Sequence, residues 1–152
     1  MKLSTKGRYG VRLMLDLALN SAKSPVTLKD IAARQDISKK YLWQLIYLLK
    51  KAGLIISSRG ARAGYVLAKS PAQIDLKDIV CVLEGKICLV ECVDNPTICK
   101  RSGSCVSRDV WQEATEKVSG VLESFTLEKM MKKHRARISN LAVASQARRK
   151  HR

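Results

Sequence analysis

Three cysteines lie at short intervals in the middle of the chain. Cys92, Cys99 and Cys105 form the pattern C-x6-C-x5-C inside a turn-rich stretch, residues 86–106. A stretch of this length is too long to be only a connector. Thiolates are the soft anionic ligands that iron-sulfur clusters require, so three of them on one loop can bind a cluster. Thiol redox chemistry without a cluster and a zinc site are the alternatives, although the closely spaced cysteine knuckles typical of zinc are absent from the sequence.

The other two cysteines, the odd cysteine count and the lack of a long apolar run all fit a protein in a reducing compartment. Cys81 falls inside a predicted helix, where cysteine usually acts as a small buried hydrophobic residue, and Cys88 fits either a buried or a ligating role. The total of five cysteines is odd, which argues against a fully paired disulfide framework. No apolar run approaches the roughly 20 residues needed to cross a bilayer, and the first residues lack the hydrophobic stretch of a signal peptide. We therefore expect a cytoplasmic protein with no membrane partner.

A second group of side chains suits the reading of base edges. Residues 39–51 predict a helix with Ser38 as its N-cap, and one face of this helix is apolar. The opposite face repeats the same spacing with a cation, an amide and two aromatic rings, namely Lys40, Trp43, Gln44 and Tyr47. A glutamine can pair with adenine, and an aromatic ring can touch a thymine methyl group.

The elements around this helix describe a winged helix-turn-helix. Residues 4–21 predict a first helix, and 28–35 a short second helix that Thr27 caps. After the third helix, residues 54–57 and 65–68 predict two strands joined by a turn that contains arginines and glycine. In this geometry the third helix enters the major groove and the hairpin lies along or in the minor groove. The expected DNA contacts are Ser38, Lys39, Lys40, Tyr41, Trp43, Gln44, Arg59, Gly60 and Arg62.

The positive charge of the chain is concentrated at its two ends. The chain has 29 Lys and Arg against 13 Asp and Glu, which gives a formal net charge of +16 and a pI near 10.0. Residues 1–70 carry +11, residues 71–125 carry −3 and residues 126–152 carry +8. Binding to a polyanion is thus separated from the function of the cysteines. No acid and base pair, nucleophile with a positioned histidine, or phosphate loop can be assembled, so we do not expect an enzyme.

The second half of the chain predicts a sensing and dimerisation segment. A short helix is expected at 76–85, and a long amphipathic helix begins at about residue 107. Its nearly heptad apolar stripe would need a partner. Residues 126–134 predict a further short helix before a solvated basic tail. The expected domains are a winged helix-turn-helix at 1–70, a cysteine-loop sensing and dimerisation segment at 71–132 and a basic tail at 133–152.

Several stretches together resemble one family. They are MKLSTKGRYGVRLMLDLA, DIAARQDISKKYLWQLIYLLKKAGLI, SSRGARAGYVLAKSP, and the three loop cysteines followed by DVW at 109–111. Over residues 1–132 the chain resembles the BadM/Rrf-two family of bacterial transcription factors, which includes iron-sulfur, nitric-oxide and cysteine-metabolism regulators. The resemblance implies a homodimer joined by the long helix, two winged helices on a palindromic operator, and a 2Fe-2S or 4Fe-4S cluster on Cys92, Cys99 and Cys105.

The chain departs from the pattern of this family at several positions. Arg108 stands where iron-sulfur members have a histidine ligand, and Arg8 aligns with an acidic ligand that nitric-oxide sensors take from the partner's first helix. The resemblance therefore does not identify the fourth ligand of the cluster. Its candidates are Cys88, Glu91, Asp109 and an external thiol. Trp43 replaces a glutamate, so the family's operator preference does not carry over, and Ala63 replaces a glycine near the hairpin tip.

The sequence predicts a mainly α fold with a small β-wing, a winged helix-turn-helix followed by a long dimerisation helix. The expected function is that of a dimeric transcriptional regulator, a repressor, that senses iron-sulfur, redox or nitric-oxide status through a cluster. One alternative is a cluster-free regulator of the same family that uses a thiol switch or a protein partner. Another is a basic RNA-binding protein with a zinc site.

Overall fold

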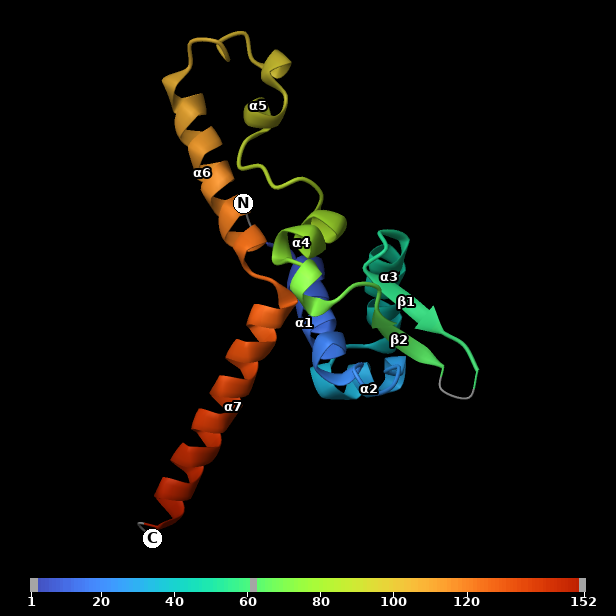
Figure 1. The fold of residues 1–152 in the computed structure, drawn as a ribbon. Coiled ribbons are helices and arrows are strands. Elements are labelled where there is room, and N and C mark those ends of the chain that lie inside the picture. The colour runs from blue at the N-terminus through green and yellow to red at the C-terminus, as the bar shows by residue number, and fades with distance from the viewer. Residues whose placement is uncertain (1–2, 61–62, 151–152) are drawn as a thin grey trace.

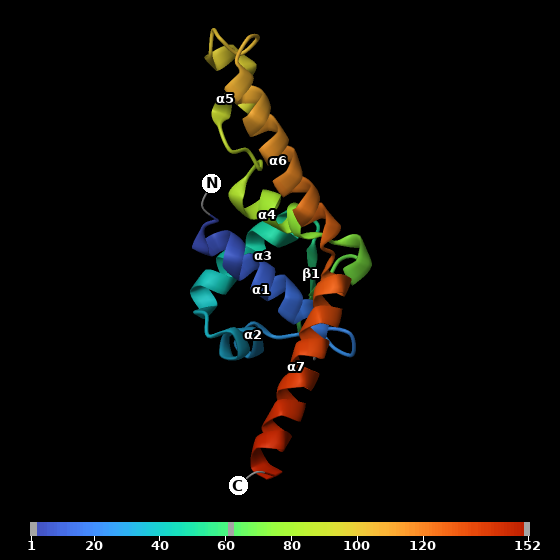
Figure 2. The same cartoon turned by 90° about the vertical axis from the view of Figure 1, so that its left-hand side faces the viewer.

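The chain folds into a helical body from which two long helices project. The computed structural model describes residues 3–60 and 63–150, and side chains within these ranges up to residue 142. Figure 1 and Figure 2 show that α6 and α7 leave the body in opposite directions. The elements in chain order are α1 (Thr5–Asn20), α2 (Leu28–Gln35), α3 (Lys39–Lys51), β1 (Ile55–Ser58), β2 (Gly64–Leu67), η1 (Pro71–Gln73), α4 (Leu76–Glu84), α5 (Glu91–Asp94), η2 (Pro96–Ile98), α6 (Val106–Ser124) and α7 (Leu127–Lys150).

Side-chain caps begin the first three helices. In each case a hydroxyl oxygen accepts a hydrogen bond from a backbone N–H that has no partner inside the helix. The capping residues are Ser4 for α1, Thr27 for α2 and Ser38 for α3. Helix α3 ends where Gly53 takes a left-handed conformation with φ 72°, as a helix C-terminus favours. The predicted caps at Thr27 and Ser38 and the predicted stop at Gly53 are confirmed.

The wing is a two-stranded antiparallel hairpin. Strand β1 pairs with β2 in a register that places Ile55 opposite Leu67 and Ser58 opposite Gly64. The strands begin within one residue of the predicted runs, 54–57 and 65–68. An isolated bridge between Val26 and Tyr65 attaches the wing to the segment that precedes α2. The hairpin is therefore attached to the helical body by this bridge as well as by its connection to α3.

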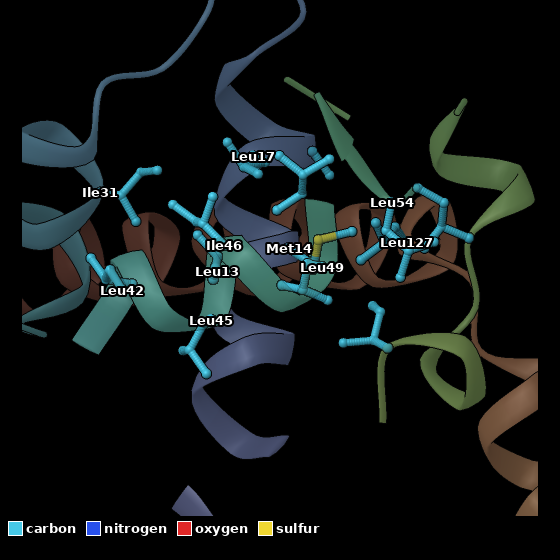
Figure 3. Close-up of a cluster of buried hydrophobic side chains, with 14 of the residues drawn as sticks. Leu13, Met14, Leu17, Ile31, Leu42, Leu45, Ile46, Leu49, Leu54 and Leu127 are labelled. Carbon is cyan, nitrogen blue, oxygen red and sulfur yellow. The ribbon is translucent and has the colours of Figure 1, made fainter. Parts of the chain in front are cut away.

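One hydrophobic core joins the helix-turn-helix to the later helices. Figure 3 shows side chains of α1, α2, α3 and α7 pointing toward one another within it. The predicted apolar face of α3 is buried, since Leu42, Leu45, Ile46 and Leu49 are each at most 2% exposed. Side chains beyond residue 70 belong to the same cluster, namely Ile74, Ile79, Leu83 and Leu127. The winged helix-turn-helix segment and the segment that follows it thus share one core.

Helix α1 packs closely against α4 because two of its residues have no side chain. A Cβ atom at Gly7 would lie 2.5 Å from Oε1 of Glu84, and one at Gly10 would overlap the Leu83 side chain. Leu83 is almost completely buried at this contact. The glycines therefore set how near α4 approaches the first helix.

The C-terminal segment differs from its prediction. A short helix over 126–134 followed by a solvated basic tail is predicted, but α7 is one helix from Leu127 to Lys150. The sequence of this segment contains no glycine or proline and is rich in Ala, Lys and Arg, which favour helix. The prediction that this helix ends at about residue 134 is wrong for this reason. Among residues 3–60 and 63–150, no helix combines the length and apolarity that a membrane crossing requires.

Candidate nucleic-acid interface and cysteine loop

The outer face of α3 presents polar and aromatic side chains to solvent. Trp43 is 57% exposed and Tyr47 is 55% exposed. Their rings stack on each other with centroids 5.9 Å apart and planes inclined by 22°. Lys40 and Gln44 lie exposed on the same helix. Stacking holds the two rings in a fixed arrangement at low entropic cost, so this face offers a shaped surface to a partner.

The start of α3 combines a cap with two free cations. The Ser38 hydroxyl accepts a hydrogen bond of 3.3 Å from the Tyr41 backbone N–H, while Lys39 and Lys40 are exposed. The Tyr41 ring is half-buried and meets the Tyr9 ring edge-on at 6.0 Å. Tyr41 is thus packed partly inward, whereas the two lysines are available to phosphates.

The wing lies on the same side of the molecule as α3, opposite α6 and α7 (Figure 1). Arg59 and Gly60 are exposed at the start of the turn, and Gly60 has φ 95°. The third wing residue predicted to contact DNA, Arg62, lies outside the described residues. Nζ of Lys50 donates a 2.8 Å hydrogen bond to Oγ of Ser57, which links the end of α3 to the wing.

Sequence reasoning missed the polar cluster that orients α2 against α1. The carboxylate of Asp16 is 3% exposed. It accepts hydrogen bonds from Nε of Arg34 at 2.9 Å, Nη2 of Arg34 at 2.7 Å and Nε2 of Gln35 at 2.9 Å. The hydrogen bond to Asp16 raises the pKa of Arg34 above its ordinary value. An acidic residue within the apolar stripe of the first helix was the signal that could have indicated this cluster.

The three loop cysteines lie at different points along the segment between α4 and α6. Cys92 is in α5, Cys99 follows η2, and Cys105 immediately precedes α6. All five thiols of the chain are free and half-buried. Within the described residues, no three or more His, Cys, Asp or Glu side chains are gathered where they could hold a metal ion. The donor set suits an iron-sulfur cluster chemically, but its binding would require the loop to rearrange.

Few contacts fasten this loop to α6. Nε of Arg108 donates a 2.9 Å hydrogen bond to the Cys92 carbonyl, and the Leu89 N–H donates one of 3.3 Å to Oγ1 of the buried Thr115. The Cys88 thiol donates to the Val90 carbonyl at 3.0 Å. Figure 1 shows the loop at the far end of α6, remote from the wing. Lightly fastened segments of this kind are where structural switching is found.

Comparison with known proteins decides the family. A family model described as Rrf2, iron-dependent transcriptional regulator, matches residues 3–133. The chain belongs to the Rrf2 family. Protein rrf2 of Nitratidesulfovibrio vulgaris is 44% identical over 132 residues, which cover 87% of this chain and 88% of that protein. Two solved structures are also similar to this chain.

The first is the structure of CymR, the global cysteine regulator of B. subtilis. It has a TM-score of 0.74 and 40% identity, and the match covers 87% of this chain and 97% of that one. The second is IscR of T. potens, with a TM-score of 0.73, 42% identity and 88% of both chains covered. These neighbours confirm the mostly helical winged-helix fold.

As a member of the Rrf2 family, the chain is a DNA-binding transcriptional regulator and not an enzyme. The family assignment favours this function over the alternative of a zinc-binding RNA-binding protein. The relatives named CymR and IscR are similar to this Rrf2-family chain to nearly the same degree. Their similarity therefore does not favour one sensing chemistry over another.

Proposed function

We propose that the chain is a homodimeric repressor that inserts α3 into the major groove of a palindromic operator and places its wing on the minor groove. The observation that carries this proposal is the exposed face of α3, where Gln44 stands beside the stacked Trp43 and Tyr47. Such side chains are costly to expose without a partner, and they match the donor, acceptor and methyl pattern of the major groove.

The residues have separate roles in this proposal. Gln44 and Trp43 read bases, while Ser38, Lys39, Lys40 and Tyr41 lie where the helix start meets phosphates or bases. Arg59 and Gly60 lie at the described edge of the wing tip, where an arginine is attracted to a narrow minor groove. Arg62 takes part in the same contact by its position in the sequence.

The proposal is tested by selecting duplex DNA with the full chain and then measuring affinity over a range of salt concentrations. Replacement Gln44→Ala should lower the affinity for the selected site about tenfold and relax sequence preference at one position.

Replacement Arg59→Ala should weaken binding and flatten the salt dependence. The control Lys132→Ala removes the same charge from α7. It should change neither the affinity for the selected site nor the salt dependence. Unchanged affinity and salt dependence for Arg59→Ala would show that the wing does not contact the DNA.

We propose further that Cys92, Cys99 and Cys105 bind a 2Fe-2S or 4Fe-4S cluster whose state alters the arrangement of the two DNA-binding units. Three half-buried free thiols on one lightly fastened loop support this proposal. The first turn of α6 contacts the loop through Arg108 and Cys92, so a change at the cysteines would be transmitted to that helix. Cys88, Glu91, Asp109 and an external thiol are the candidates for the fourth ligand.

Anaerobic purification and reconstitution test the cluster. The unaltered chain should contain iron and acid-labile sulfide, and Cys92→Ala should lose both while its circular dichroism is retained. Cys81→Ala is the matched control, because Cys81 lies in α4 away from the loop, and it should keep the cluster. Stoichiometric iron and sulfide in Cys92→Ala would contradict the ligand assignment.

A cluster-free thiol switch, or control by a protein partner, is the second candidate. All five thiols are free and half-buried, so they are partly accessible to an oxidant, which supports a thiol switch. In that case anaerobic protein carries no iron, and an oxidant alone changes its affinity for the operator. Measuring operator binding with and without reconstituted cluster separates the two candidates.

A further inference from the structure

A small pocket lies where α1, the start of α4 and α7 meet. Its volume is about 250 Å³, and its apolar walls are Leu15, Leu76, Phe125 and Met130. Figure 2 shows α7 running past the end of α1 at this junction. Phe125, which lines the pocket, follows the last residue of α6, whereas Cys105 of the cysteine loop precedes the first, so the pocket is separate from the sensing chemistry proposed above.

The rim of this pocket is cationic. Lys133, His134 and Arg137 all project from α7 beside the apolar walls. None of the described residues that line the pocket is acidic, and none of these three forms a salt bridge with a carboxylate of the described residues. Nζ of Lys133 lies 4.4 Å from the centroid of the Phe125 ring. The nearby carboxylate of Glu128 is bound to Lys132, which lines a different pocket.

Apolar walls with cations at the mouth match one class of ligand. An aromatic body can pack against Phe125 and Met130, and a carboxylate at its end can accept hydrogen bonds from the guanidinium of Arg137 and the ammonium of Lys133. A nucleic-acid phosphate would leave the apolar walls uncovered, since it has no apolar body to bury. The volume falls just below the range usual for drug-sized ligands, so the ligand is small.

We infer that this pocket binds a small aromatic carboxylate as an effector. Two backbone hydrogen bonds of 2.9 Å cross beside it, from Leu76 N–H to the Phe125 carbonyl and from Leu127 N–H to the Ile74 carbonyl. These bonds fix the bend between α6 and α7 to the segment that leads into α4. An occupant that contacts Leu15, Phe125 and Met130 together touches α1, the bend and α7, and so stabilises one arrangement of the three.

The test uses the full chain and 3-phenylpropionate as the probe. Isothermal titration should show saturable binding, and the neutral amide of the probe should bind about tenfold more weakly. Arg137→Ala should also weaken binding about tenfold, because it removes a charged hydrogen bond. Arg135→Ala is the matched control, since Arg135 is on the same helix with the same charge but lines the other pocket, and it should bind like the unaltered chain.

A second measurement locates the probe. The methyl resonance of Met130 should shift on titration with 3-phenylpropionate, and the shift should saturate with the same affinity. Three results would each overturn the inference: no saturable binding, equal binding of acid and amide, or equal losses in Arg137→Ala and Arg135→Ala. Binding of an acidic peptide in the absence of any response to the small acid would overturn it as well.

Discussion

At the scale of single residues, the carboxylates of the buried Asp16 and the exposed Glu84 connect α1 to neighbouring helices. Asp16 joins α1 to Arg34 and Gln35 of α2 through three hydrogen bonds. Glu84 accepts one hydrogen bond of 2.5 Å from the Ser4 hydroxyl and one of 2.7 Å from the Gly7 N–H. The Asp16 contact orients α2 against α1, and the Glu84 contact holds the N-terminus of α1 against the end of α4.

Replacement Asp16→Asn should destabilise the chain by about 2 kcal/mol, because the charge of Arg34 then loses its partner. Arg34 is 39% exposed and can regain some water, which keeps the loss below that of a fully buried pair. Urea unfolding measures the change. The control Glu128→Gln breaks an exposed ion pair of 3.1 Å and should cost at most about 0.5 kcal/mol. Equal losses of unfolding free energy in Asp16→Asn and Glu128→Gln would contradict a stabilising role for the buried Asp16 carboxylate.

The Glu84 contacts predict a dependence of stability on pH. The hydrogen bond from Ser4 holds the pKa of Glu84 below its ordinary value of 4.5. A carboxyl group with a lowered folded-state pKa stabilises the fold at pH values above its ordinary pKa, and this contribution is lost as the pH falls through the folded-state value. The stability difference between the unaltered chain and Glu84→Gln should therefore be constant near neutral pH and shrink in acid.

Urea unfolding of both proteins between about pH 7 and about pH 3 tests this dependence. Ser4→Ala removes the main cause of the lowered pKa, so the stability of this variant should fall less between neutral pH and acid than that of the unaltered chain. A difference that does not change with pH would show that Glu84 acts only by packing.

At the scale of elements, the approach of α1 to α4 depends on Gly10. Its position leaves no room for a methyl group beside the buried Leu83. The close approach lets α4 complete the core that α1 and α3 begin, so the orientation of α3 depends on it.

Gly10→Ala should destabilise the chain by about 1 to 2 kcal/mol, because overpacking outweighs the gain in helix propensity. Leu83→Ala alone should cost about 2 to 4 kcal/mol through the cavity it leaves. The double variant should lose less than the two single variants together, by about 1 kcal/mol, because each change makes room for the other. Strict additivity in urea unfolding would show that the two side chains do not meet.

At the scale of the whole molecule, several apolar side chains of α6 are left uncovered by the described part of the chain. Val110 and Val121 are each 57% exposed and Trp111 is 45% exposed, although all three lie on a helix of 19 residues. Figure 1 shows this helix standing away from the body. An apolar stripe of this kind, at nearly heptad spacing, is typical of helices that pair between two copies of a chain.

Val121→Lys should convert the proposed dimer into a folded monomer, because it places a charge in the apolar stripe and removes nothing from the core of the chain. Sedimentation equilibrium should show the dissociation constant raised at least tenfold, with circular dichroism unchanged. Glu116→Gln alters the charge by the same amount on a polar position of α6 and should leave the dimer intact. A dimer of unchanged affinity in Val121→Lys would place the interface elsewhere.

The sequence by itself determined the local parts of this protein. The apolar repeat of α3, the caps at Thr27 and Ser38 and the stop at Gly53 are properties of neighbouring residues, and the structure confirms each of them. Only the tertiary structure decided which distant groups meet. Ser4 and Glu84 are 80 residues apart in the chain, and no periodic pattern relates them.

The same reason explains why two further features could not be predicted from the sequence. A pattern shows which face of a helix is apolar, but not which element covers it, so the pocket between α1, α4 and α7 had no signal in the sequence. The cysteine spacing identifies a set of thiol ligands, but their distances depend on how the loop packs against α6. Local periodicity thus specified the helices and their faces, while long-range packing decided their partners.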